Sequence, residues 1–250
     1  MTRLIRAEAL RLATTRTYWL LAAGAIALIA GGIAPAAAAT SFTSGTSPAR
    51  SVLAIAGLTQ TIALIAGALS VTGEFRHKTI TAAVLITPRR TPLLAAKLIT
   101  LTAAGMAFGL AATGMASAIT LPLLAARHLP AGISGTGTAA IIIGGGIATA
   151  LAAAIGVGTG AIIRNQVGAI IAVLALLYVA EPLLGFIPHL GTVIQQYGLA
   201  GLAAAATRTT GFPAGAHLLG QPAAVLILAG YATAVLLAGA ALLRRRDIPT

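Results

Sequence analysis

Six long apolar runs constrain this chain more than any other feature of its sequence. A helix rises about 1.5 Å per residue and the hydrocarbon core of a bilayer is about 30 Å thick, so roughly 20 apolar residues can span it. The runs cover about residues 18–39, 51–71, 93–124, 138–163, 167–187 and 222–243. Only 8% of the 250 residues are charged, whereas a soluble domain has about 25%. The sequence therefore predicts an all-α membrane protein with a single transmembrane domain over residues 1–250.

The residues before the first run form a basic segment. Ile5, Ala9 and Leu12 recur at helical spacing, while Arg3 and Arg11 share roughly the opposite side. An apolar stripe opposed by cations is typical of a helix that lies in the membrane interface. We therefore expect an N-terminal amphipathic interfacial helix.

The first apolar run has a second interpretation. A basic start followed by an apolar stretch and the small residues APAAAA at 34–39 also resembles a secretory signal with a cleavage site. The run is long enough to span the bilayer, and Tyr18 and Trp19 fit the aromatic anchors found at membrane interfaces. These features favour a retained first span.

Residues 188–221, between the fifth and sixth runs, are mixed in polarity. Pro188, Gly211, Pro213 and Gly220 interrupt them, and an apolar piece such as 198–206 is too short to span a bilayer. Irregular backbone at membrane depth is tolerated where protein covers it. We therefore expect short re-entrant or interfacial helices here.

The basic residues set the expected orientation. With six spans, 13 of the 16 cations fall on the side of the two termini, and only Arg50, Arg127 and Arg208 fall on the other. Cytoplasmic loops carry the excess of Lys and Arg, so both termini are expected on the cytoplasmic side of the membrane. Only two of the 16 cations are Lys and alanine is abundant, which indicates a GC-rich bacterial genome and therefore a bacterial plasma membrane. Because the cations lie at the ends of spans, they act as orientation signals, and we expect no nucleic-acid partner.

The longest charged segment is Thr72–Leu98, between the second and third spans. It carries six of the 20 formally charged residues, so we expect it to lie in cytoplasmic water. Within it, Thr79–Thr87 is a semi-apolar stretch that ends at Pro88, which predicts a short helix suited to the groove of a partner. The alternative is a solvated loop whose cations only fix the topology.

These residues resemble the cytoplasmic coupling segment of ABC-2 type transporter permeases. The resemblance rests on Gly73-Glu74-Phe75-Arg76-His77, Thr79-Ile80, Pro88-Arg89-Arg90 and Lys97. The basic start before Tyr18-Trp19, the turn Arg164-Asn165, the pair Glu181-Pro182 and the end Arg245-Arg246-Asp247-Ile248 agree with it. The resemblance covers the whole chain.

The resemblance implies the membrane subunit of an ATP-binding cassette exporter. It implies a homodimer, or a heterodimer with a related permease, docked on a separately encoded ATPase that holds ATP and Mg, with no cofactor in this chain. The expected ATPase contacts are Glu74, Phe75, Arg76, Thr79, Arg89 and Arg90. The apolar spans favour a hydrophobic or amphiphilic substrate. The alternatives are a secondary carrier and a non-transporting scaffold or immunity protein.

The sequence lacks the motifs expected for nucleotide hydrolysis, metal binding or catalysis. There is no GxxxxGK[ST] phosphate loop, no cysteine and no HExxH motif, so we expect no enzyme and no metal or catalytic site in this chain. The glycine pairs Gly105/Gly109 and Gly156/Gly160 have GxxxG spacing, which lets helices approach closely. Whether they pack within one chain or between two stays open at this point.

Glu181 is the one acid deep in an apolar run. A carboxylate at such depth is costly unless it is paired, hydrated or protonated, so it is a candidate functional residue. The alternative is a helix-end acid already in water at the outer face.

Overall fold

Every element that the computed structural model describes is helical, and the described residues are 1–40, 47–76, 90–210 and 218–245. No strand occurs among them. The first half contains α1 (Thr2–Thr14), α2 (Arg16–Ala39), α3 (Pro48–Leu53), the 3-10 turn η1 (Ala54–Gly57), α4 (Leu58–Arg76) and α6 (Arg90–Ala126). The second half contains α7 (Gly135–Ile162), α8 (Gln166–Ala175), the π turn η2 (Leu176–Ala180), α9 (Glu181–Gly185), α10 (Leu190–Tyr197), α11 (Leu199–Thr207) and α12 (Gln221–Arg245).

Six helical segments of the described chain are long and apolar enough to cross a membrane, which confirms the predicted class. They are Arg16–Ala39, Pro48–Glu74, Pro92–Ala126, Gly135–Ile162, Gln166–Gly185 and Gln221–Leu242. Each predicted span overlaps one of them, with ends that differ by a few residues. The second segment is the least regular, because α3 and η1 precede α4 within it.

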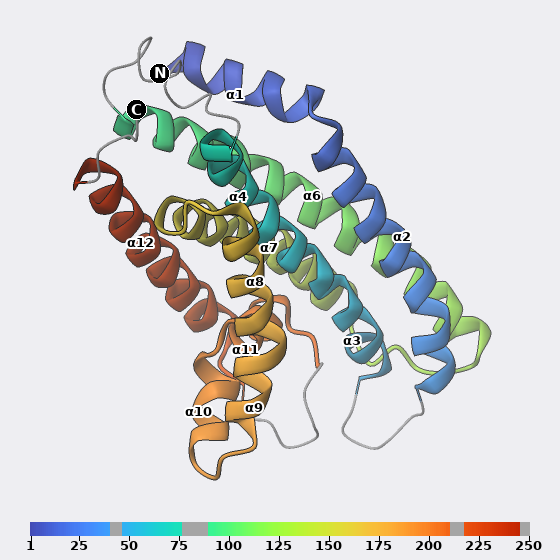
Figure 1. Ribbon diagram of the computed structural model, residues 1–250. Helices are drawn as coiled ribbons and strands as arrows, with labels where there is room; N and C mark the ends of the chain where they lie inside the picture. The colour runs from blue at the N-terminus through green and yellow to red at the C-terminus, as the bar shows by residue number, and fades with distance from the viewer. Residues whose placement is uncertain (41–46, 77–89, 211–217, 246–250) are drawn as a thin grey trace.

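Helix α7 forms the centre of the bundle, with α4, α6 and α12 packed around it (Figure 1). Of its most apolar 18-residue window, 72% is buried, against 17–44% for the other five spans. Its sequence, GTGTAAIIIGGGIATALAAAIGVGTGAI, is dominated by small residues. Small side chains let neighbouring backbones approach closely, which is how helices pack in a membrane. This composition therefore suits α7 to the position with most neighbours.

The GxxxG pairs pack within this one chain. A Cβ atom on Gly109 of α6 would lie 2.6 Å from the Gly145 carbonyl of α7, and one on Gly160 of α7 would lie 2.6 Å from the Ala68 carbonyl of α4. A side chain does not fit in either place without moving backbone. The helices α4 and α6 thus contact α7 through glycine, and the hydroxyls of Thr59 and Thr149 add a buried 3.1 Å hydrogen bond between α4 and α7.

Helix α1 lies at the same end of the bundle as the C-terminal end of α12 (Figure 1), and it packs on α6. The predicted helix is present, and its predicted faces are correct except at Ala9 and Arg11. Ile5 and Leu12 do turn inward, whereas Ala9 is exposed and Arg11 is half-buried beside them. Arg11 turns inward because it forms an ion pair with Glu74 of α4. The periodicity of α1 alone cannot reveal this partner.

Residues 188–221 contain two short helices, α10 and α11, as the sequence predicted in outline. Helix α11 packs against α7 and α12 and buries Leu202, Ala205 and Ala206. With eight and nine residues, neither helix is long enough to cross a bilayer. Whether either one enters the membrane stays a prediction.

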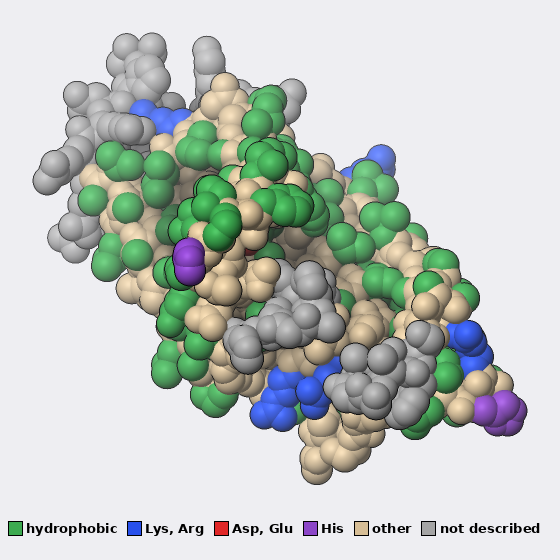
Figure 2. Space-filling view, turned by 90° about the horizontal axis from the view of Figure 1, so that it is seen from below, with side chains coloured by type: hydrophobic (Ala, Val, Ile, Leu, Met, Phe, Trp, Pro, Cys, Tyr) green, Lys and Arg blue, Asp and Glu red, His purple; other side chains and the backbone are tan. Residues whose placement is uncertain are grey.

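The outer surface of the bundle is largely apolar. Large side chains such as Leu20 and Leu226, each 72% exposed, point away from the core. Seen from the end that carries α3, α9 and α10, hydrophobic side chains cover much of the surface and the cations gather in a few separate places (Figure 2). Exposed apolar side chains on the spans can contact lipid favourably, which agrees with a multi-pass membrane protein.

A glycine-to-alanine pair tests the packing around α7. We expect Gly160→Ala to lower stability by about 1–3 kcal/mol, because its methyl group forces α4 and α7 apart. Gly114→Ala on α6 is the matched control, since nothing lies within 4 Å of its added Cβ, and it is expected to be neutral or stabilising. Thermal unfolding in detergent measures both. Equal unfolding temperatures for the two variants would contradict the close contact.

Candidate functional site

Four charged side chains meet where α1, α4 and α6 come together. The Lys97 ammonium of α6 lies 2.7 Å from the Glu74 Oε1 atom of α4 and 2.9 Å from the Glu8 Oε1 atom of α1. Arg11 of α1 donates a hydrogen bond to Glu74 and lies 3.9 Å from Glu8. We call these four residues the ion cluster. Two cations and two carboxylates make it neutral.

The ion cluster is largely removed from solvent. Lys97 is 2% exposed and Glu74 is 5% exposed, while Arg11 keeps 41% of its side-chain surface accessible. Burying charges costs several kcal/mol per ion unless each charge is paired and hydrogen-bonded. Here the Lys97 ammonium is paired with two carboxylates, Glu8 of α1 and Glu74 of α4. Partners from two other helices therefore compensate the burial of its charge.

The surroundings of Arg11 favour its charged form. Partial burial by itself would lower the pKa of its guanidinium, but the charge of Glu74, their hydrogen bond and the charge of Glu8 raise this pKa above its ordinary value. Arg11 therefore stays charged at any physiological pH. The charge of Arg11 therefore keeps α1 attached to Glu74 of α4.

The ion cluster corrects the expectation that the whole of Thr72–Leu98 lies in water. Helix α4 continues to Arg76 and α6 begins at Arg90, so both ends of that segment belong to the spans, and Glu74 and Lys97 are buried. Opposite charges from three helices replace the water that each would otherwise need. The sequence prediction counts Lys97 as an orientation signal and as part of the segment that resembles a coupling segment. Its apolar flanks, LLAAKLIT, also mark it as a membrane-embedded charge that needs a partner.

Of the six expected ATPase contacts, the structure describes the side chain of Glu74 alone. Thr79 and Arg89 lie outside the described residues, as does most of the predicted coupling segment, residues 77–89. Phe75, Arg76 and Arg90 belong to the ends of α4 and α6, and only their backbone is described. Glu74 faces the cluster. The sequence prediction missed Glu8 and Arg11, because nothing in α1 indicates that it packs against α4 and α6.

Glu181 caps a helix. Its Oε1 atom accepts a 2.6 Å hydrogen bond from the Leu199 N–H group and its Oε2 atom a 3.0 Å bond from the Ala200 N–H group. These are the first donors of α11, which carries the positive end of its helix dipole there. Glu181 is 8% exposed. The acid is thus neither unpaired in lipid nor freely wet, and the structure gives it a positioning role between α9 and α11.

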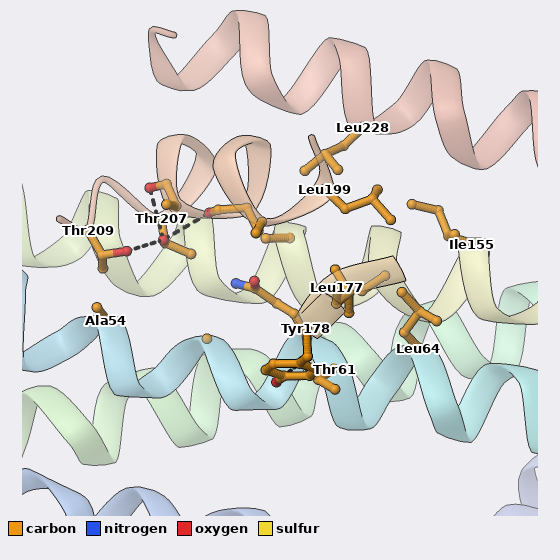
Figure 3. A pocket seen from close by; sticks show the side chains of 17 residues that line it. Ala54, Thr61, Leu64, Ile155, Leu177, Tyr178, Leu199, Thr207, Thr209 and Leu228 are labelled. Atoms are coloured by element: carbon orange, nitrogen blue, oxygen red, sulfur yellow. Dashed lines mark hydrogen bonds between the residues drawn. The ribbon is translucent and has the colours of Figure 1, made fainter. Parts of the chain in front are cut away.

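A cavity lies between η1, α4, α7, η2, α11 and α12. Its volume is about 200 Å³. Figure 3 shows aliphatic side chains gathered at one end and Thr207 and Thr209 at the other. The aliphatic group consists of Leu64, Ile155, Leu177, Leu199 and Leu228. The cavity is therefore apolar at one end and polar at the other.

Backbone breaks near Pro182 shape one wall of this cavity. Proline has no N–H group, so the carbonyl four residues earlier, that of Tyr178, loses its usual helical partner. The chain widens there into the π turn η2, which brings Leu177 and Tyr178 to the cavity. The Tyr178 hydroxyl then bonds the Thr61 hydroxyl of α4 at 3.1 Å. The predicted pair Glu181-Pro182 thus positions two cavity walls, η2 and α11.

Metal chemistry finds no site in the described part of the chain. No group of three or more histidine, cysteine, aspartate or glutamate side chains is arranged there to hold a metal ion. His77 and His217 lie outside the described residues.

The ion cluster can be tested with a charge-removal pair. Lys97→Met leaves two buried carboxylates short of a cation, and we expect a loss of about 3–5 kcal/mol. Adding Glu74→Gln restores neutrality with the Glu8–Arg11 pair and should recover part of that loss. Thermal unfolding of both single variants and the double variant measures their coupling. Strict additivity would mean that Lys97 and Glu74 do not interact.

The Glu181 cap can be tested by comparing two substitutions. Glu181→Ala removes both acceptors from the start of α11 and should cost about 1–2 kcal/mol. Glu181→Gln keeps one acceptor oxygen and should fall between this variant and the parent. Limited proteolysis near residues 190–210, together with thermal unfolding, measures the effect. An alanine variant as resistant as the parent would disprove the cap.

No protein-family model matches this chain, and no curated protein matches its sequence. The membrane class therefore rests on the six spans and on the surface that they present, and the function has to be argued from the geometry of the ion cluster and the cavity.

Proposed function

We propose that the chain is the membrane permease subunit of an ABC transporter, an exporter of hydrophobic or amphiphilic substrates. A separately encoded ATPase, which holds ATP and Mg, drives it. The observation that carries the proposal is the ion cluster, because its Glu74 and Lys97 flank the segment 77–89, in which the sequence resembles a coupling segment. Both termini and this segment are placed in the cytoplasm of a bacterial cell.

The ion cluster suits a mechanical role. Its Lys97–Glu74 pair ties the last turn of α4 to the second turn of α6, and its Glu8 and Arg11 add α1 to the same body. A force applied to the connection between α4 and α6 then moves these ends together instead of separating them. Helix α7 packs tightly against both, so the motion reaches the bundle centre. ATP-driven closure would in this way shift the balance between two arrangements of the spans.

The distribution of cations supports the proposed orientation. Arg50 lies within α3, Arg127 follows the end of α6 and Arg208 follows the end of α11, away from α1. Arg127 donates a hydrogen bond to the Ala37 carbonyl at the end of α2. Most other cations of the described chain fall in α1 or near the helix ends beside it. This asymmetry favours α1 on the cytoplasmic side. Two permease chains, identical or related, would complete the membrane part.

A secondary carrier is the second candidate. It would need a membrane-embedded acid that is available to a coupling ion. Glu181 is the acid that the sequence offers for this role, and both its oxygens are occupied by α11. A scaffold or immunity protein would share the six spans without needing an ATPase. Dependence on an ATPase partner therefore separates the proposal from both alternatives.

The partner can be captured directly. The tagged chain is purified in mild detergent from its native membrane, and we expect an ATPase that carries GxxxxGK[ST] to co-purify. Arg89→Glu should reduce its recovery at least several-fold, because it places repulsion in the proposed contact. Arg208→Glu, the same change at the opposite end of the bundle, is the control. Glu74 is avoided here because its loss would disrupt the ion cluster.

The outcome decides between the candidates. Recovery of an ATPase with the parent and the Arg208→Glu chain, but not with Arg89→Glu, supports the proposal and locates the contact. Purification of the chain alone, under conditions that keep a known ABC transporter assembled, would overturn it.

A further inference from the structure

The cavity beside Tyr178 continues along the bundle as a narrow apolar space. A second cavity of about 120 Å³ shares Leu64, Ile155, Leu177 and Leu199 with it and extends between α4, α7 and α8 towards Thr159. The shared residues are those of the aliphatic end in Figure 3. The two cavities therefore lie one after the other along α7, and this elongated arrangement suits a hydrocarbon chain better than a compact ring system.

One polar side chain that lines the cavity has no hydrogen-bond partner among the described residues. The hydroxyls of Thr61 and Tyr178 bond each other, as do those of Thr207 and Thr209 at 2.9 Å. The Gln60 amide lines the same cavity, and within the described chain it has no hydrogen-bond partner. Gln60 is half-buried, and the part of its amide that faces the cavity gains from a hydrogen-bonding partner. A ligand with one polar group would supply it.

The absence of charged side chains in the described cavity lining, and the exposure of Tyr178 at its rim, limit the class of ligand that can bind. No Asp, Glu, Lys, Arg or His side chain is among the described residues that line either cavity, so an ionised head group would be left unpaired there. Tyr178 lines the cavity and is 55% exposed on the apolar outer surface. A ligand can therefore reach the cavity from the bilayer, past Tyr178.

We propose that this cavity binds one uncharged, single-chain amphiphile. Its hydrocarbon chain occupies the aliphatic end, and its hydroxyl or amide head group exchanges hydrogen bonds with Gln60. Binding does not depend on an ATPase; only the identification of this ligand class as the exported cargo rests on the proposed function. Pockets of this kind, apolar with few placed polar groups, are typical of small-molecule sites.

Photolabelling of the isolated chain tests the site. The chain is placed in nanodiscs of a single diacyl phospholipid and exposed to a long-chain alcohol that bears a diazirine in its alkyl tail. We expect saturable labelling of residues on α4, α7 or α11, mapped by mass spectrometry. A carboxylate and a quaternary ammonium of the same chain length should compete about tenfold more weakly than the unlabelled alcohol, because their charges find no partner.

Two variant pairs locate the ligand. Gln60→Leu should weaken labelling by the alcohol about tenfold, the value of one buried hydrogen bond, while Gln196→Leu outside the cavity should not. Ala203→Leu fills the cavity and should abolish labelling, while Ala223→Leu on the exposed face of α12 should leave it unchanged. Size-exclusion chromatography establishes that each variant folds. If Gln60→Leu does not fold, the Ala203→Leu pair decides.

Three results would overturn the inference. They are equal labelling of both members of either pair, equal competition by the charged analogues, and labelling that rises in proportion to the alcohol concentration without saturating, which would identify the space as an ordinary lipid contact. Because no ATPase is present, failure here leaves the proposed transporter function standing. Conversely, labelling of a chain that captures no ATPase would support the site and overturn the transporter.

Discussion

The close backbone contact between α7 and its neighbours is the interaction on which the rest of this structure depends. Between helices in lipid there is little hydrophobic driving force, so association relies on close packing and on polar contacts. Gly109 against α7 and Gly160 against α4 supply that packing, and the Thr59–Thr149 bond adds a polar contact. With α7 fixed, α4 and α6 are held side by side, and their ends can share the ion cluster.

The buried charged residues of the described chain, Glu74, Lys97 and Glu181, are compensated by partners from distant segments. Lys97 and Glu74 neutralise each other with the help of Glu8 and Arg11 of α1, and Glu181 receives the first N–H groups of α11. Each arrangement joins helices that hydrophobic packing alone would leave free to slide. The ion cluster stiffens the end at which a partner is proposed to push. The Glu181 cap fixes two walls of the cavity at the other half of the bundle.

In the proposed mechanism, the ion cluster and the cavity are coupled through one helix. Helix α4 takes part in both, with Glu74 in the ion cluster and Gln60, Thr61 and Leu64 in the cavity. A displacement of α4 relative to η2 would break the Thr61–Tyr178 bond and change the rim of the cavity. The energy of such a motion is carried by a rigid helix, which needs no chain of side-chain rearrangements between the regions.

The sequence by itself determined the class, the six spans and the helices of residues 188–221, because a backbone in lipid has to satisfy its own hydrogen bonds and apolar runs of sufficient length therefore become helices. It also identified the glycine pairs as packing sites. Only the tertiary structure decided that Arg11 turns inward, that Glu74 and Lys97 are buried together, and that Glu181 caps α11. These outcomes depend on which helix faces lie opposite each other, and residues such as Glu8 and Lys97, 89 positions apart, carry no local signal of their meeting.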